Sequence, residues 1–364
     1  MGDQATISER EAKVLGIIET ARGKRGKFRD QKINMSHGAG GKATQSLIEG
    51  LLAPAFANAT LDEMADAGAL TVEGVELAMT TDSFVVKPLR FPGGSIGTLA
   101  VHGTINDLAV AGARPLALTL SLVLEEGLGA DELRAEVDAV ATAAAAAGVS
   151  VIAGDTKVVE RGHADGMYVC TTGIGQRDPR AQLSPNALKP GDRILLSGSI
   201  GEHGTAIMLA RNEFELDAEI ESDSCSLWPA VDTLLDAVGP SLRCMRDATR
   251  GGVASVLNEL ARSSSVAMIV RERDVPVKPA VVGAAEILGI DPMYMANEGK
   301  MVVFVAPDAA DEALTALRAV PGCELAAQIG EVRTTPPGMV LVQTSFGGRR
   351  VMDQLVGDPL PRIC

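Results

Sequence analysis

Apolar blocks alternate with mixed polar and apolar blocks through the first half of the chain. Four blocks rich in Val, Leu, Ile and Thr predict strands, at residues 77–86, 114–126, 149–159 and 167–175. The blocks between them predict helices at 97–113 and 130–148, and a glycine-rich turn that opens a further helix at 34–52. Strands and helices that alternate in this way indicate an α/β layer architecture, the fold class we predict.

A polar stretch with prolines at 177–193 predicts a domain boundary, because 364 residues exceed what one hydrophobic core usually holds. The pattern beyond it predicts a second α/β unit, with a strand, glycine turn and helix at 194–211, a helix with its entry loop at 246–264, and strands at 300–307 and 339–345. The predicted organisation is an N-terminal extension (1–32), a first domain (33–178), a second domain (179–346) and a flexible tail (347–364).

Composition narrows the class of protein. No apolar run reaches the roughly 18 residues of a membrane helix, and the N-terminus has no secretory signal, so we expect a cytoplasmic protein. The cysteines are five, an odd number, without a CxxC pair, which argues against a disulfide framework or a zinc site. The net charge of −14 disfavours nucleic acid and anionic membranes as partners. The basic run RGKRGKFRDQK in the extension is either a solvated tail or a docking segment for a partner protein.

The segment HGAGGK, residues 37–42, is a glycine-rich loop ahead of a predicted helix. Such a loop lets backbone N–H groups approach phosphate oxygens, and the helix N-terminus adds a favourable partial charge. It does not match the Walker A pattern, and an ordinary tight turn explains it equally well.

Four aspartates lie at predicted strand ends or helix entries, namely Asp82, Asp107, Asp155 and Asp247. Open α/β sheets bind ligands at strand ends, and carboxylates suit Mg²⁺, which bridges to substrate phosphates. An acidic protein could hold ATP in this way, although each aspartate alone is commonly a turn or helix-capping residue.

Further candidates lie beside these positions. Lys157 follows Asp155 directly and could neutralise phosphate or transfer a proton, or form a surface salt bridge. Glu298 precedes a strand and is either a general base or a turn residue. His102 and His203 each precede glycine and could contact phosphate, although a histidine satisfied within the protein is more common.

The chain ends in a thiol, Cys364, after Pro359 and Pro361. The adjacent α-carboxylate disfavours the thiolate, so strong activation as a nucleophile is not expected. A carrier arm that another enzyme loads fits the position better, and an inert terminal cysteine is the alternative.

Several motifs together resemble one family. The segments SHGAGGK, TTDSFVVKPLRFPGGSIGTLAVHGTINDLAVAGARP, GDTKVV, GEHGTAIM, DATRGGVASVLNE, NEGK and the closing PRIC are similar to those of the HypE family of hydrogenase maturation carbamoyl dehydratases. The resemblance runs from about Asn34 to Cys364. It extends to a wider superfamily that includes aminoimidazole ribonucleotide synthetase and selenophosphate synthetase, and it implies their two-domain fold and a homodimer formed through the N-terminal domains.

The resemblance implies an activity and partners. In the family, HypF places a carbamoyl group on the terminal cysteine, and HypE uses ATP to dehydrate the thiocarboxamide to a thiocyanate. The cyanide passes to iron on a HypC–HypD complex, as a ligand for the [NiFe] hydrogenase centre. Removing water from an amide requires its oxygen to become a leaving group, which phosphorylation by ATP with Mg²⁺ achieves. A base must then take the N–H protons.

The resemblance also assigns roles by position. The implied catalytic residues are Cys364, Lys157 and Glu298, and the implied metal ligands are Asp82, Asp107 and Asp155. The implied nucleotide-binding residues are Gly38, Gly40, Gly41, Lys42, His102, Asn106, Thr156 and Asp247.

Two other functions remain open at this point. One is a superfamily synthetase or kinase that acts on a free small molecule, with Cys364 incidental. The other is a docking protein without catalysis, whose tail engages a partner and which binds no nucleotide.

Overall fold

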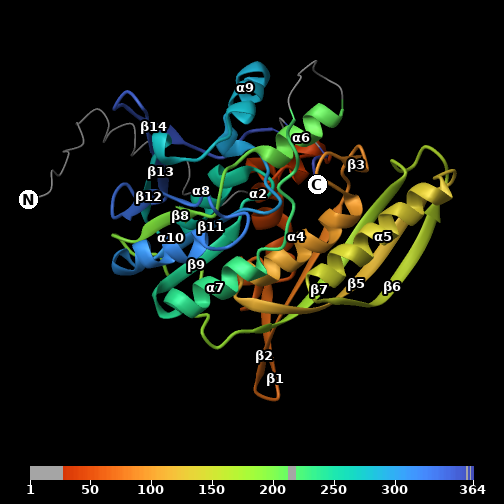
Figure 1. Ribbon diagram of the computed structural model, residues 1–364, viewed down its shortest axis with the longest axis horizontal. Helices are drawn as coiled ribbons and strands as arrows, with labels where there is room; N and C mark the ends of the chain where they lie inside the picture. Colours follow the sequence, from red (N-terminus) through yellow and green to blue (C-terminus); the bar gives the residue numbers. More distant parts are fainter. Residues whose placement is uncertain (1–27, 212–218, 358–359, 361) are drawn as a thin grey trace, which may run out of the picture.

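The computed structural model describes residues 28–211, 219–357, 360 and 362–364. Most of the predicted N-terminal extension, and the prolines at 359 and 361, lie outside these residues. The described chain forms two α/β halves, each built on its own sheet (Figure 1), so the predicted fold class is confirmed. No described helix is both long and apolar enough to cross a membrane.

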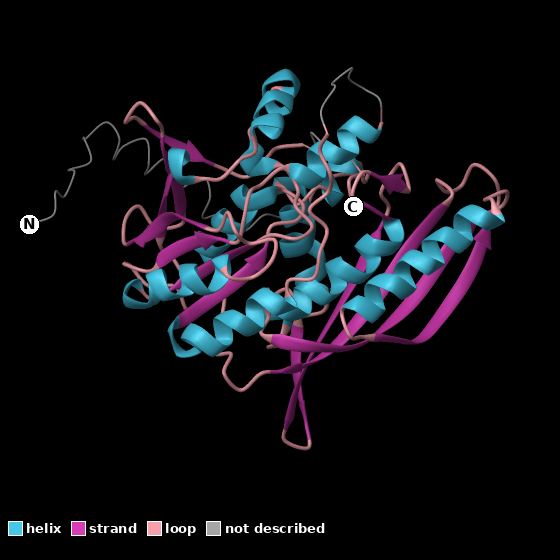
Figure 2. Cartoon of the chain, viewed as in Figure 1, coloured by secondary structure: helices cyan, strands magenta, loops and turns pink. Residues whose placement is uncertain are grey.

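The N-terminal half has a five-stranded sheet in the order β1-β2-β7-β5-β6. Its strands are β1 (Gly68–Val72), β2 (Val75–Phe84), β5 (Ala113–Glu125), β6 (Ser150–Val159) and β7 (Met167–Arg177). Only the β5–β6 pair is parallel. Helices α4 (Ile96–Val110) and α5 (Ala130–Ala146) pack on one face (Figure 2).

Small residues let α4 approach the sheet closely. A Cβ added at Gly103 of α4 would lie 2.8 Å from the ring of Phe84 on β2, which leaves no room for a side chain. The helix ends earlier than the predicted residue 113, because Gly112 has a φ of +74° and turns the chain into β5.

The C-terminal half has a seven-stranded sheet in the order β14-β13-β10-β12-β8-β11-β9. Its strands are β8 (Arg193–Leu196), β9 (Leu242–Asp247), β10 (Ala267–Arg271), β11 (Met301–Val305), β12 (Ala327–Arg333), β13 (Met339–Gln343) and β14 (Arg349–Met352). Its helices are α6 (Glu202–Ala210), α7 (Trp228–Val238), α8 (Gly252–Ser263), α9 (Pro279–Leu288) and α10 (Ala310–Arg318).

Strand β11 shows why the sequence of the C-terminal half contains continuous apolar runs. All five of its residues are buried, and they alternate between two apolar clusters. Val302 and Phe304 pack with residues of α8, whereas Met301, Val303 and Val305 pack with residues of α7 and α10. A strand that is covered on both faces does not show the alternation of polar and apolar residues that a half-exposed strand shows.

Short elements complete the chain. The N-terminal segment contains η1 (Met35–Gly38), α2 (Lys42–Leu47), η2 (Ile48–Leu52), α3 (Ala53–Ala55) and η3 (Leu61–Glu63). A two-stranded ribbon joins β3 (Arg90–Phe91) to β4 (Gly94–Ser95). The remaining single turns are η4 (Gly239–Ser241), η5 (Glu272–Asp274), η6 (Pro292–Tyr294) and η7 (Pro307–Ala309).

The described residues of the predicted tail, 347–357, 360 and 362–364, contact both halves of the protein. Its first part is the strand β14, which pairs antiparallel with β13. The last residues return to the N-terminal half, where the N–H of Val85 donates to Cys364 O at 3.0 Å and the N–H of Lys87 donates to Arg362 O at 3.3 Å. Leu360 and Ile363 are buried in the apolar cluster beside β2. These described residues are therefore docked on the body, where backbone pairing and apolar burial offset the entropy of ordering them.

Candidate functional site

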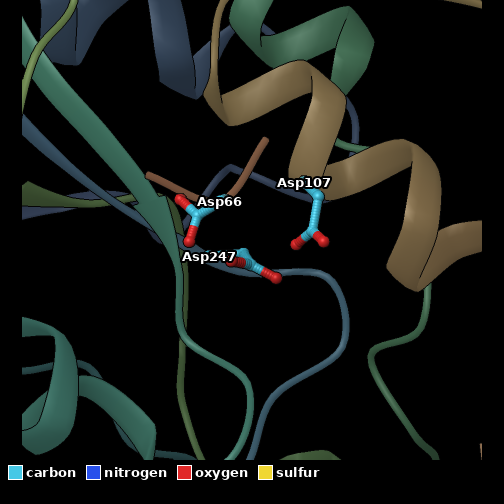
Figure 3. Close-up of side chains that lie close together, drawn as sticks. All are labelled: Asp66, Asp107 and Asp247. Carbon is cyan, nitrogen blue, oxygen red and sulfur yellow. The ribbon is translucent and has the colours of Figure 1, made fainter. Parts of the chain in front are cut away.

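Three carboxylates from both halves converge between the two sheets (Figure 3). Asp66 precedes β1, Asp107 lies on α4 and Asp247 ends β9, and one carboxylate oxygen from each lies within 4.8 Å of the others. Burial, together with the charge of Asp66, raises the pKa of Asp247 to about 8. Carboxylates that repel one another in a desolvated site are suited to a hard divalent cation.

The neighbours of this aspartate cluster hold it in place. Arg246 forms an ion pair with Asp66, and the hydroxyl of Thr80 donates to Asp107 Oδ2 at 2.8 Å. Burial and then the charges of Asp247, Asp66 and Asp82 raise the pKa of Asp107 well above its usual range. Asp82 therefore belongs to the same electrostatic group. Of the four aspartates that the sequence analysis names, Asp82, Asp107 and Asp247 lie in this group and Asp155 does not. Asp66 was missed, since nothing in its local sequence marks it.

Glu298 lies in the loop before β11 and is only 2% exposed. Its Oε1 has no hydrogen-bond partner among the described residues. Burial, followed by the charges of Asp82 and Asp223, raises the pKa of Glu298 well above its usual range. The N–H of Glu298 donates to Asp223 Oδ1 at 3.1 Å, which fixes the backbone. A fixed, buried carboxyl with an unused oxygen is arranged to exchange a proton.

Arg250 joins the glycine-rich loop to these carboxylates. Its Nη1 donates to Gly38 O at 2.8 Å, and the charges of Cys364, Asp82 and Glu298 raise its pKa. Gly40 has a φ of +72°, and a Cβ there would lie 2.6 Å from Arg250 O, so only glycine fits. Sequence reasoning missed Arg250, although it lies inside the DATRGG block.

The terminal thiol lies beside this loop. Cys364 lines a pocket of about 120 Å³, together with Gly38, Ala39, Val85 and Arg250. The pocket places Cys364, the glycine-rich loop and the cation Arg250 next to one another. A group carried on Cys364 would therefore lie beside a loop and a cation that could hold the phosphates of a donor.

His203 and Arg211 hold the last carbonyls of the chain. His203 Nε2 lies 2.6 Å from Ile363 O, and its Nδ1 lies 2.8 Å from Ser222 Oγ. Because a carbonyl only accepts, Nε2 must carry the proton. Burial lowers the pKa of His203, so the ring is neutral and Nδ1 accepts from the serine. Arg211 donates to Arg362 O at 2.6 Å and to Lys87 O at 2.8 Å.

We expect Arg211→Ala to loosen the docked tail. The substitution removes the hydrogen bond of a charged donor to Arg362 O, so alkylation of Cys364 by iodoacetamide should become about tenfold faster. Mass spectrometry of the C-terminal peptide over time measures this rate. Arg134→Ala on α5, where the arginine pairs with Asp131, is the matched control and should alkylate like the wild type. An unchanged rate in Arg211→Ala would show that Arg211 does not hold the tail.

A single chain does not bring Asp155, Thr156 and Lys157 to the other candidates. They lie on the outer strand β6, where Lys157 Nζ pairs with Asp155 Oδ2 at 2.5 Å and both side chains are more than 60% exposed. Asp155 stands in the same cross-strand row as Ser83 of β2, with β7 and β5 between, a separation of about 14 Å. Because side chains alternate along β2, Asp155 points to the face opposite Asp82.

Three further candidates have partners within the protein. Asn106 is buried, and its side chain donates to Cys225 O and Glu298 O and accepts from the N–H of Leu227. His102 Nδ1 lies 3.0 Å from Ser224 Oγ, and burial lowers the pKa of His102 to about 4. Lys42 Nζ pairs with Asp353 at 2.8 Å. Asn106 therefore braces α4 against the loop that carries Glu298.

Comparisons with known proteins show which families the chain is similar to. Family models of AIR synthase related proteins match at residues 64–176 (N-terminal domain) and 189–342 (C-terminal domain). A curated relative, the carbamoyl dehydratase HypE of Rhizobium leguminosarum bv. viciae, is 49% identical over 92% of this chain and 95% of its own length. The HypE of Escherichia coli (strain K12) is 43% identical over 91% and 99%.

Solved structures give the same result. A HypE–HypF complex superposes with a TM-score of 0.81 at 43% identity and covers 85% of this chain and 100% of that one. A HypE in complex with ATP superposes with a TM-score of 0.77 at 43% identity and covers 92% and 100%.

Proposed function

The chain belongs to the HypE family of carbamoyl dehydratases, and we propose that it dehydrates a carbamoyl group carried on its own Cys364. It is an enzyme of hydrogenase maturation that uses ATP. The observation that supports Cys364 as the carrier is its pocket, which it shares with the glycine-rich loop and Arg250. A synthetase acting on a free small molecule would not require the last residue to lie there.

The chemistry balances as follows. The carbamoyl oxygen attacks the γ-phosphorus of ATP, the bond to ADP breaks, and the oxygen becomes part of a phosphate leaving group. Loss of the two N–H protons and departure of phosphate then form the C≡N bond on sulfur. The products are S-cyanocysteine, ADP and phosphate. No redox partner is needed, because the carbon keeps its oxidation state.

Each step has candidate residues in this chain. Backbone N–H groups of Gly38, Gly40 and Gly41 would hold phosphate oxygens, and Arg250 would offset the charge that develops during phosphoryl transfer. Glu298 would accept an N–H proton. Lys157 would neutralise phosphate charge or move a second proton. Further nucleotide contacts are proposed for Lys42, His102, Asn106, Thr156 and Asp247.

Magnesium suits the carboxylates of this site. We propose ligands among Asp82 and Asp107, together with Asp66 and Asp247, whose oxygens lie close to Asp107. Asp155 could join them only from a second copy of the chain. A bound Mg²⁺ would supply positive charge to the transferring phosphoryl group. Burial and then the charges of the neighbouring carboxylates raise the pKa of Asp107, and a bound cation would offset both effects.

The substitution Asp107→Asn should stabilise the metal-free chain and weaken the binding of Mg–ATP. It removes one of the repelling charges, so the metal-free chain should gain of the order of 1 kcal/mol of unfolding free energy. The binding of Mg–ATP should weaken at the same time. Thermal unfolding with and without Mg–ATP measures both effects. If the variant is stabilised by Mg–ATP as strongly as the wild type, Asp107 is not a ligand.

A homodimer would bring Lys157 to the site. Strand β6 is an open edge with exposed apolar side chains, Ile152 at 68% and Val158 at 67%, and such edges are usually covered. Met79 of β2 is also 43% exposed. We propose that a second copy covers this sheet, and that Lys157 of the partner subunit faces the pocket of Cys364.

Mixing two inactive variants tests this arrangement. Lys157→Ala and Cys364→Ala homodimers should each be inactive, whereas subunit exchange should restore activity, because one site of the mixed dimer has both groups. Intact mass spectrometry after Mg–ATP addition to the carbamoylated mixture should then show the loss of one water. If Lys157 acts within its own chain, the mixture stays inactive.

Partners follow from the same chemistry. HypF, which forms a complex with a HypE relative, is the proposed source of the carbamoyl group, and a HypC–HypD complex is the proposed acceptor of cyanide. A reaction that needs ATP and a reduced thiol suits the cytoplasm.

The test of the function itself uses the full chain carbamoylated by HypF. Addition of Mg–ATP should lower its mass by one water, and ADP should form in equal amount. Formation of ADP without the loss of mass would favour a reaction on a free small molecule instead.

A further inference from the structure

The loop that carries Glu298 lies against a second loop, residues 222–225, from a distant part of the chain. The two loops approach closely at Gly299, where an added Cβ would collide with Asp223 O and lie 2.5 Å from Cys225 Sγ. Only glycine fits at such a contact. The position of the second loop is therefore fixed relative to Glu298.

Asp223 links the two loops. Its Oδ1 accepts the N–H of Glu298 at 3.1 Å, and its Oδ2 accepts the N–H of Gly299 at 3.2 Å and a bond from Lys300 Nζ at 3.2 Å. The side chains of Asp223 and Lys300 are only 3% and 8% exposed. All three partners are donors, so the ionised carboxylate is the form that satisfies them.

Residues of both halves hold the second loop, and they include three candidates from the sequence analysis. The hydrogen-bond partners are His203 Nδ1 for Ser222 Oγ at 2.8 Å, His102 Nδ1 for Ser224 Oγ at 3.0 Å and Asn106 Nδ2 for Cys225 O at 2.9 Å. Because the loop is held from α4 and from α6, Asp223 is a fixed anchor for the backbone of Glu298.

Glu298 faces charged groups from several elements. Burial raises its pKa most, and the charges of three carboxylates raise it further, namely Asp82 of β2, Asp223 of the second loop and Asp247 of β9. The charge of Arg250 lowers it, and the neutral ring of His203 has its Nε2 3.9 Å from Glu298 Oε1. Of the three carboxylates, Asp223 also bonds to the backbone of Glu298, so it both holds this residue and acts on its charge.

Lys300 limits the effect of Asp223. Burial opposes the positive charge of Lys300, but the charge of Asp223 prevails and raises the pKa of Lys300, so the ammonium group persists beside the carboxylate. A positive charge there offsets part of the repulsion between Asp223 and Glu298. Without it, Glu298 would ionise only at a higher pH.

We propose that Asp223 and Lys300 are positioning residues for the dehydration, which hold the loop of Glu298 and tune Glu298 as the base. The inference rests on the proposed function, in which Glu298 accepts an N–H proton. A stronger base takes a proton faster once it is ionised, but it is ionised over a narrower range of pH. The pair would balance these two requirements. The sequence analysis names neither residue, although Lys300 ends the NEGK motif.

Opposite shifts of the pH profile test this role. The single-turnover dehydration of the carbamoylated full-length chain, at saturating Mg–ATP, should become faster with rising pH as Glu298 ionises. Asp223→Asn removes a negative charge near Glu298, so this climb should move to lower pH by on the order of one unit. Lys300→Met removes a positive charge, so the climb should move to higher pH. A purely structural role would not move the two profiles in opposite directions.

Asp192→Asn is the matched control. The side chain of Asp192 is also only 2% exposed, accepts the N–H of Lys189 at 2.7 Å and pairs with Arg243 at 3.5 Å. It precedes the end of β8 that pairs with Val305, the end of β11 far from Glu298. We expect this variant to lose stability and to keep the wild-type pH profile.

The two variants give a clear outcome even if one of them does not fold. Lys300→Met keeps both backbone hydrogen bonds of Asp223, so it answers the question if Asp223→Asn is unfolded. A Lys300→Met profile that does not move to higher pH, or two variants that shift in the same direction, would overturn the proposal while the wild type still climbs. A wild type without any climb would instead contradict the role of Glu298 in the proposed function.

Discussion

Replacing Cys364 with serine should abolish formation of the thiocyanate while leaving Mg–ATP binding intact. Serine is nearly isosteric, and the backbone contacts that dock the residue do not involve its side chain, since Val85 binds its carbonyl. In the proposed function the sulfur is the atom that carries the group, so its loss would remove the substrate itself. Intact mass after incubation with HypF and Mg–ATP should show no carbamoyl addition and no later loss of water.

A second cysteine serves as the control for this variant. Cys225 is exposed, and its replacement with serine should leave the mass change of the wild type in place. Mg–ATP should raise the thermal stability of Cys364→Ser as it does for the wild type, by about 2.7 kcal/mol at a ligand concentration of 100 times Kd. Turnover of Cys364→Ser at the wild-type rate would show that Cys364 is not the carrier.

Glu298→Gln should lower the dehydration rate by about 10²- to 10⁴-fold, the usual loss for a general base. The amide keeps the shape of the side chain but cannot accept the proton. ATP affinity should stay unchanged and the chain should not be destabilised, because a buried charge among Asp82, Asp223 and Asp247 is removed. Single-turnover mass spectrometry on the carbamoylated chain gives the rate apart from loading by HypF.

Glu202→Gln is a matched control, since Glu202 is also 2% exposed and also has one oxygen without a partner, but its Oε1 bonds to Ser199 and Lys278. We expect it to lose stability and keep the single-turnover rate. The pH profile adds a second readout. Because the pKa of Glu298 is raised, the wild-type rate should climb with pH above the usual range of a glutamate, as the carboxyl ionises. A Glu298→Gln variant that keeps both the rate and this climb would exclude Glu298 as the base.

Local pattern was sufficient for much of the fold. The strands around 77–86 and 149–159 and the helix at 130–148 are nearly where the apolar pattern puts them, because each follows from residues close in sequence. Strand β14 was not foreseen, since GGRRVMDQ has little apolar alternation and depends on β13 for its pairing. The docking of the last three residues depends on His203 and Arg211, which are far away in the chain.

The sequence by itself determined the α/β class and the resemblance to the HypE family. The class follows from the apolar pattern within each strand and helix, and the resemblance follows from short motifs, so both can be read from residues that are close in sequence. Only the tertiary structure decided which charged groups meet. Packing of α4 against β9 brings Asp247 to Asp107, the ion pair with Arg246 holds Asp66 beside them, and the register of four strands sends Lys157 to the opposite face. Contacts between these distant residues depend on strand order and helix packing, and no local sequence pattern encodes either of them.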